Sequence, residues 1–166
     1  MIPGPPYSIS MGRLSSREAT GQDLPFMLET FRLNFGAIIE EARGWDDVIE
    51  EGQLRRDMNL APTLILLYEG ERAGFLSFEV HDAVYIRNIE VHPDFNGRGV
   101  GTLAIRWLGR IGEGKPIRVA VTDGNHRGME FYTNIGFRKV GEITLPMQGS
   151  RGPQMLRKTM MQLDMK

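Results

Sequence analysis

A strand, a glycine-rich turn and a helix follow one another between Ile86 and Leu108, and this succession constrains the fold more than any other part of the chain. The segment from Val84 to Val91 intersperses polar residues among Val, Tyr and Ile, as a strand does. Gly97, Gly99 and Gly101 allow a close backbone approach to a ligand. They lie where the first turn of a helix presents unpaired N–H groups and the positive end of its dipole. The stretch therefore predicts a binding site for a phosphate or pyrophosphate. The helix itself is predicted from an apolar face at three- and four-residue spacing, made of Val100, Leu103, Ala104, Trp107, Leu108 and Ile111.

Composition favours an ordinary globular protein with few special partners. The 166 residues are 41% hydrophobic and 25% charged, and the net charge of −1 gives no electrostatic reason to bind nucleic acid or an anionic membrane. The absence of cysteine excludes disulfides and thiolate nucleophiles, and three dispersed histidines give no metal-ligand spacing, so we predict no metal. No apolar stretch approaches the roughly 20 residues that span a bilayer, and the N-terminus lacks the pattern of a signal peptide. We therefore expect a cytoplasmic protein with no membrane or nucleic-acid partner.

The remaining segments predict an α/β fold in one domain. Residues 1–12, rich in Pro, Gly and Ser, are expected to form a flexible leader before a single domain over residues 13–166. Asp23 is predicted to cap the first helix, with Pro25 in its first turn. Further helices are predicted over residues 46–58, 100–111 and 125–135. Strands are predicted over residues 14–18, 63–68, 73–80, 84–91, 117–122, 137–145 and 155–161.

Two motifs, in this order, resemble the GNAT superfamily of N-acyltransferases. The segment Asn96-Gly-Arg-Gly-Val-Gly101 looks like the acyl-CoA signature Q/R-x-x-G-x-G/A, and the segment from Asn125 to Phe137 resembles the second motif, N-x-x-A-x-x-F/L-Y-x-x-x-G-F. Asn96 in place of Gln or Arg, and Gly128 in place of Ala, depart from the family without removing a backbone donor. The resemblance covers residues 13–161. It implies a mixed, mostly antiparallel sheet of six to seven strands, flanked by about four helices and splayed between the fourth and fifth strands.

The resemblance also implies acetyl-CoA as the cosubstrate. Its pyrophosphate would accept hydrogen bonds from the turn, and its pantetheine arm would run along the strand at residues 89–91. A backbone N–H near Val91 would then polarise the thioester carbonyl. Arg127 would face the 3′-phosphate, although a solvent-exposed arginine is the alternative. The expected cofactor-binding residues are Ile89, Val91, Asn96, Gly97, Arg98, Gly99, Val100, Gly101, Thr102, Asn125 and Arg127.

Two residues are candidates for the chemistry. Tyr132, placed beside the sulfur by the resemblance, would protonate the leaving thiolate, because a phenol with a pKa of about 10 stays protonated at neutral pH. The alternative is that it only packs against the sheet. Glu90 is the candidate base, directly or through water; alternatively it pairs with Arg87. His92 precedes Pro93 and is expected to belong to a structural turn.

The acceptor is expected to be an amine, in a small molecule or a peptide. An acidic cluster surrounds Trp45, and Trp45 with Asp46 is the candidate substrate contact, since carboxylates beside an aromatic ring suit a cation. The alternative is an ordinary solvated surface. A homodimer is a further option, because relatives commonly dimerise and methionines gather near the C-terminus.

The predicted function is acetyl transfer from acetyl-CoA to a primary amine, by direct attack in a ternary complex. The alternative on the same fold is a non-catalytic acyl-CoA sensor or interaction module, because fold does not guarantee activity. A dinucleotide-binding domain fits less well, since Thr102 occupies the third glycine position of its fingerprint. A Walker P-loop is absent from the sequence.

Overall fold

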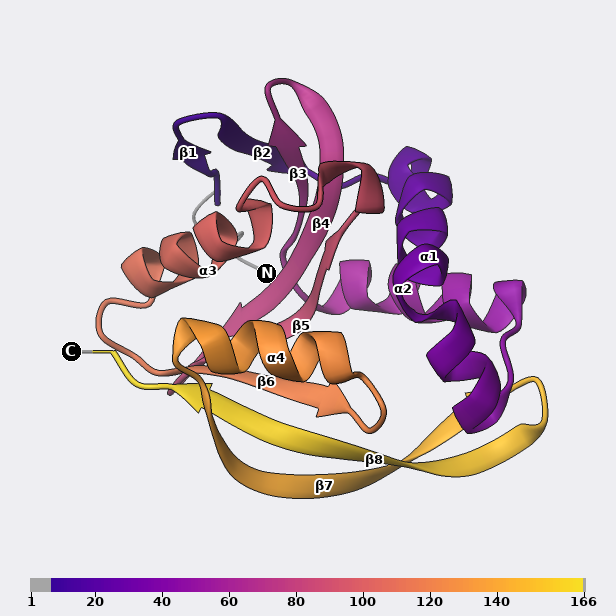
Figure 1. Cartoon of the computed structure of the whole chain (residues 1–166). Helices are drawn as coiled ribbons and strands as arrows, with labels where there is room; N and C mark the ends of the chain where they lie inside the picture. The colour runs from indigo at the N-terminus through magenta and orange to yellow at the C-terminus, as the bar shows by residue number, and fades with distance from the viewer. Residues whose placement is uncertain (1–6, 166) are drawn as a thin grey trace.

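A single eight-stranded sheet forms the centre of the molecule, with helices on both of its faces (Figure 1). The computed structural model describes residues 7–165. The order across the sheet is β1-β2-β3-β4-β5-β6-β8-β7, and every neighbouring pair is antiparallel except β5 with β6. The strands are β1 (Ser10–Met11), β2 (Leu14–Glu18), β3 (Thr63–Tyr68), β4 (Glu71–Val80), β5 (Val84–Val91), β6 (Ile117–Thr122), β7 (Arg138–Gly149) and β8 (Gly152–Leu163). The helices are α1 (Leu24–Arg43), α2 (Asp47–Leu60), α3 (Val100–Ile111) and α4 (His126–Ile135), with short 3-10 turns at Gly21–Asp23 and Pro93–Phe95.

The two pairs of helices cover opposite faces of the sheet. On one face, buried residues of α1 and α2 (Leu24, Met27 and Leu54) pack against Ile65 and Phe75 of the strands. On the other face, α3 buries its apolar side in a larger cluster with side chains of β3 to β6 and with Tyr132 of α4. Strands β3 and β4 contribute to both clusters because successive side chains point to opposite faces.

The sheet opens between β5 and β6. These strands pair only through Val84 with Ile117, Tyr85 with Arg118 and Ile86 with Val119, and beyond this point residues 88–91 of β5 pair with β4 alone. A bulge in the β4–β5 register places Arg87 as an extra residue where the pairing ends. The predicted splay between the fourth and fifth predicted strands, at residues 84–91 and 117–122, is therefore confirmed.

The β7–β8 hairpin reaches across the molecule to the C-terminal end of α1 (Figure 1). Its turn is held there by a hydrogen bond of 3.3 Å from the N–H of Ser150 to the carbonyl of Gly44. The guanidinium of Arg43 donates to the carbonyl of Gln148 at 2.8 Å. A Cβ added at Gly149 would collide with the Arg43 carbonyl, so the close approach of the two backbones requires glycine. The hairpin thus closes the end of the structure where β5 and β6 diverge.

Three predicted details need correction. Residues 1–6 of the predicted leader lie outside the described residues, but residues 7–12 pack against the domain: Ile9 is buried and the Tyr7 ring contacts those of Phe78 and Trp107. Asp23 stands at the start of α1, but its carboxylate accepts from Arg17 and from the N–H of Thr20 rather than from the helix. Both strands of the last hairpin are longer than predicted, because they pair with each other along their whole length. Within residues 7–165, no helix is long and apolar enough to cross a membrane.

Candidate functional site

The glycine turn ends in a left-handed backbone conformation at the start of α3. Gly97 and Gly99 have φ angles of 78° and 75°, which L side chains rarely adopt, and Gly99 is the N-cap of the helix. The N–H groups of the first helical turn have no partner within the helix, and Leu103 is the residue that donates to the Gly99 carbonyl, at 2.9 Å. The turn therefore offers a set of backbone donors together with the positive end of the helix dipole.

A cavity of about 950 Å³ joins this turn to the opening between β5 and β6. It passes between the two strands, so residues from both faces of the sheet line it. Most of the predicted cofactor-binding and catalytic residues meet there: Ile89, Glu90, Val91, Asn96, Gly97, Gly99, Val100, Gly101, Thr102, Asn125, Arg127 and Tyr132.

Some backbone N–H and C=O groups of β5 point into this opening. The N–H of His92 donates to the carbonyl of Ala73 in the segment of β4, at 2.7 Å. Because alternate residues of an antiparallel strand direct their N–H groups to opposite neighbours, the N–H groups of Val91 and Ile89 point away from β4 and toward the splayed edge. This edge can pair with an extended ligand as a strand would.

Glu90 lies at the centre of the cavity wall and is almost completely buried. Its exposed fraction is 6%, and its carboxyl oxygen accepts from the side-chain amide of Asn34 in α1 at 2.9 Å. The same nitrogen of Asn34 donates to the Val91 carbonyl at 3.0 Å, so both amide hydrogens are used. Burial raises the pKa of Glu90 to about 8, against a smaller opposing effect of the Asn34 hydrogen bond. Pairing of Glu90 with Arg87, the alternative considered from the sequence, does not occur.

Tyr132 approaches the cavity from α4, on the opposite side of the opening. Its ring packs edge-on against Phe131 and Phe137, each at 5.1 Å between centroids, while the residue also lines the cavity. Burial raises its pKa, and the nearby charge of Glu90 raises it further, so the hydroxyl stays protonated. The tyrosine thus packs between two aromatic rings and also lines the cavity with a protonated hydroxyl.

A family model described as "Acetyltransferase (GNAT) family" matches residues 24–137. The chain belongs to the GNAT family. Solved GNAT structures share its architecture: a GCN5-related N-acetyltransferase from Rhodopseudomonas palustris is 21% identical, with a TM-score of 0.69 over 95% of this chain and 99% of that one. The ribosomal-protein-S18-alanine N-acetyltransferase of Escherichia coli is 19% identical, with a TM-score of 0.60 over 92% and 94%. An acetyltransferase from Salmonella typhimurium that modifies the N-terminal serine of ribosomal protein L7/L12 is 16% identical, with a TM-score of 0.68 over 94% and 97%. At these identities the likeness shows the fold, and it confirms the GNAT resemblance read from the sequence.

Three of the predicted contacts lie outside the GNAT cavity. Arg98 turns away from it and places its guanidinium over the rings of Tyr68 and Phe95. Asp46 caps α2, where its carboxylate accepts from the N–H groups at positions 48 and 49. Trp45 packs on Phe31 at 5.8 Å and donates its indole N–H to Asp47. Local hydrogen bonds thus use the polar groups of Trp45 and Asp46, and their role as acceptor contacts stays a prediction.

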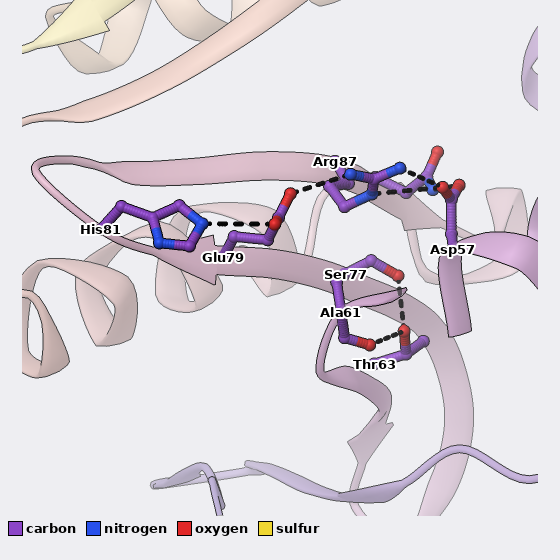
Figure 2. Close-up of polar contacts among 8 residues, drawn as sticks. Asp57, Ala61, Thr63, Ser77, Glu79, His81 and Arg87 are labelled. Carbon is purple, nitrogen blue, oxygen red and sulfur yellow. Dashed lines mark hydrogen bonds and ion pairs between the residues drawn. The ribbon is translucent and has the colours of Figure 1, made fainter. Parts of the chain in front are cut away.

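Charged pairs outside the motifs connect the elements around the cavity. Arg87 bridges Asp57 of α2 and Glu79 of β4, with N–O distances of 2.8 Å to each, and His81 contacts Glu79 at 3.3 Å (Figure 2). This chain of side chains ties α2 to the bulged strand β5. Deeper in the wall, the buried Arg43 and Glu50 form a two-bond ion pair with N–O distances of 2.6 and 3.1 Å.

Sequence reasoning did not identify Asn34, Arg43 or Lys158 as lining residues. All three lie in the cavity wall but outside the two GNAT motifs. Asn34 and Arg43 occupy α1, and their partners are 56 and 105 positions away in the chain. The one local signal was polarity: Asn34 interrupts an apolar helix face between Phe31 and Ile38. Within residues 7–165, no group of three or more His, Asp or Glu side chains forms a metal-ligand cluster.

Proposed function

We propose that this GNAT protein transfers an acetyl group from acetyl-CoA to a primary amine by direct attack in a ternary complex. The observation that carries the proposal is the shared cavity, in which the donor-rich turn before α3, the open edge of β5, Tyr132 and Glu90 face one space. Family membership supports acetyl transfer, and the polar groups of the cavity match what that reaction needs.

The first requirement is a place for the cosubstrate. Backbone N–H groups from Gly97 to Thr102 suit a pyrophosphate, because they combine hydrogen-bond donation with the dipole of α3. The splayed edge at Ile89 and Val91 suits the amide groups of a pantetheine arm. An N–H of this edge would also stabilise negative charge on the thioester oxygen during attack.

The second requirement is a balanced proton transfer. The amine nitrogen bonds to the acetyl carbon and the carbon–sulfur bond breaks, so the amine loses a proton and the thiolate gains one. In this proposal Glu90 takes the amine proton, directly or through water, and the Tyr132 hydroxyl gives a proton to the sulfur. A covalent acetyl-enzyme on cysteine is excluded, because the chain has none.

Calorimetric titration of acetyl-CoA into the purified protein tests the proposal first, with NAD and ATP as controls. We expect micromolar binding of acetyl-CoA alone. A free-thiol assay across a set of amines then follows turnover. Binding without release of thiol from any amine would favour a non-catalytic acyl-CoA sensor, and binding of a nucleotide instead of acetyl-CoA would refute the proposal.

A further inference from the structure

The wall of the cavity formed by α1, α2 and β8 contains one ammonium, that of Lys158, which makes no direct ion pair with the described residues. Lys158 of β8 lines the cavity and is partly buried, yet its side-chain ammonium makes no hydrogen bond or ion pair with any of residues 7–165. From this, and resting on the proposed function, we infer that the amine acceptor carries a negatively charged group that binds Lys158.

The other charged groups of this wall are already paired. The carboxylate of Glu50 accepts hydrogen bonds from both terminal nitrogens of Arg43. Asp57 accepts from Arg87 through one oxygen, at 2.8 Å, and from Asn88 through the other, at 2.7 Å. The two carboxylates therefore have little capacity left to attract a cationic acceptor, whereas the ammonium of Lys158 has all three donors available.

The position of Lys158 places it on the acceptor side of the sheet. It is paired with Thr122 of β6, next to the pair of Val121 with Thr159. Val121 faces the cluster formed with α3 and α4, so the alternation of side chains directs Lys158 to the other face, where α1 and Glu90 lie. Burial lowers the pKa of Lys158 and the nearby charges of Arg43 and Arg87 lower it further, while the charge of Asp57 opposes them in part. An enclosed cation of this kind gains most from an anionic partner.

The rest of the wall indicates an apolar body between the amine and the anion. Phe31 and Phe35 of α1 stack with centroids 5.2 Å apart, and both line the cavity together with Ile38. Leu156 and Met147 of the β7–β8 hairpin face the same space. An apolar or aromatic amino acid combines the three expected features: an amine for Glu90, an apolar side chain for α1 and a carboxylate for Lys158.

Matched acceptors test the inference. Phenylalanine and its β- and γ-amino homologues vary the separation of amine and carboxylate, and the corresponding amides remove the charge with little change in shape. We expect at least one acid to have a KM about tenfold or more below that of its amide. The amide has more of its amine unprotonated at neutral pH, so a preference for the acid would run against amine reactivity.

Variants of Lys158 connect this preference to the residue. Lys158→Met should raise the KM of the preferred acid about tenfold or more, leave kcat and the KM of acetyl-CoA nearly unchanged, and leave the amide unaffected. Lys158→Arg should restore most of the preference because it keeps the charge. Lys115→Met is the matched control, since Lys115 is exposed in the turn between α3 and β6 and does not line the cavity.

Two results would overturn the inference without touching the proposed function. One is equal or better use of the amides, with acetyl-CoA still bound. The other is a Lys158→Met variant that lowers kcat for acids and amides alike, which would assign Lys158 to proton transfer. Titration of the acids into the CoA-saturated protein makes the same comparison without turnover, and failure of every acid to bind there would also refute it. Failure of acetyl-CoA itself to bind would instead refute the proposed function.

Discussion

The side-chain amide of Asn34 donates a 2.9 Å hydrogen bond to the carboxyl group of Glu90, across the contact between α1 and β5. This bond opposes the effect of burial, which dominates and raises the pKa of Glu90 to about 8. Glu90 is consequently protonated over much of the neutral range and becomes a base only as the pH rises.

The pH dependence of turnover follows from this pKa. A base must be deprotonated to act, so we expect kcat to rise with pH through about 8. Asn34→Ala removes a donor that favours the ionised carboxylate, so the rise should move to higher pH, by about one unit. Glu90→Gln should abolish this rise. A profile that keeps its position in both variants would show that another group or water controls the titration.

Tyr132→Phe tests the proton donor. The ring remains to pack against Phe131 and Phe137 while the hydroxyl is lost. We expect kcat to fall about 100-fold, as for the loss of a general acid, with a small change in the dissociation constant of acetyl-CoA. Thermal unfolding provides the control for packing. An unchanged kcat, provided that the chemical step limits the rate, would refute the role of Tyr132.

Gly99→Ala should weaken binding of acetyl-CoA. Its φ of 75° costs an L side chain about 1–2 kcal/mol, so the turn would shift away from the conformation that aims its N–H groups. Gly114→Ala is the matched control, because Gly114 has a φ of 90° and open space around its Cα but does not line the cavity. Both variants should lose similar stability, and calorimetry should find lower affinity only for Gly99→Ala. Equal affinities would mean that the turn is not the phosphate site.

Asp23→Asn tests a buried ion pair remote from the cavity. The carboxylate pairs with Arg17 and Arg72, and the hydrogen bond from Arg17 is the main reason that its pKa is lowered to about 2. A lowered folded-state pKa stabilises the protein above the unfolded value of 3.8, and this stability is lost as the pH falls through about 2. We expect the variant to lose about 2 kcal/mol of unfolding free energy at pH 7 and much less near pH 2. Chemical denaturation at both pH values measures the difference, and a loss independent of pH would contradict this account.

Gly149→Ala should disturb the acceptor side of the cavity alone. A Cβ at this position would collide with the carbonyl of Arg43 and push the β7–β8 turn away from α1. We expect a higher KM for the amine and little change for acetyl-CoA. Gly141→Ala in the same strand is the control, since its Cβ would meet open space. Similar acceptor KM values in both variants would show that the docked turn does not shape the acceptor side.

The cosubstrate side of the fold was predictable from the sequence, and the acceptor side was not. The turn before α3 could be predicted because its determinants are local in the sequence. The glycines at 97 and 99 and the apolar face of the helix belong to one short segment. The splay came from the family resemblance, and its physical basis, the short pairing of β5 with β6, is a long-range property. Trp45 and Asp46 do not line the cavity, and their role as acceptor contacts stays a prediction. In a sequence, charge near an aromatic ring looks the same whether it caps a helix or binds a ligand, and in the structure Asp46 caps α2.

The position of Lys158 shows most clearly what the sequence could not predict. Its neighbours in sequence give a strand of mixed polarity, and only the pairing of β8 with β6 places it beside a cavity whose other wall is α1. The hydrophobic pattern of a single segment therefore cannot predict that Lys158 lies beside this cavity.

The strand order has a consequence for how the protein is made. β8 lies between β6 and β7, so β7 leaves the ribosome before the only strand on which it can pair. The hairpin that closes this end of the cavity over α1, and Lys158 with it, can assemble only after β8 has been synthesised. A nascent chain that already has its glycine turn and α3 would still lack this wall of the cavity, so the two sides of the cavity form at different stages of translation.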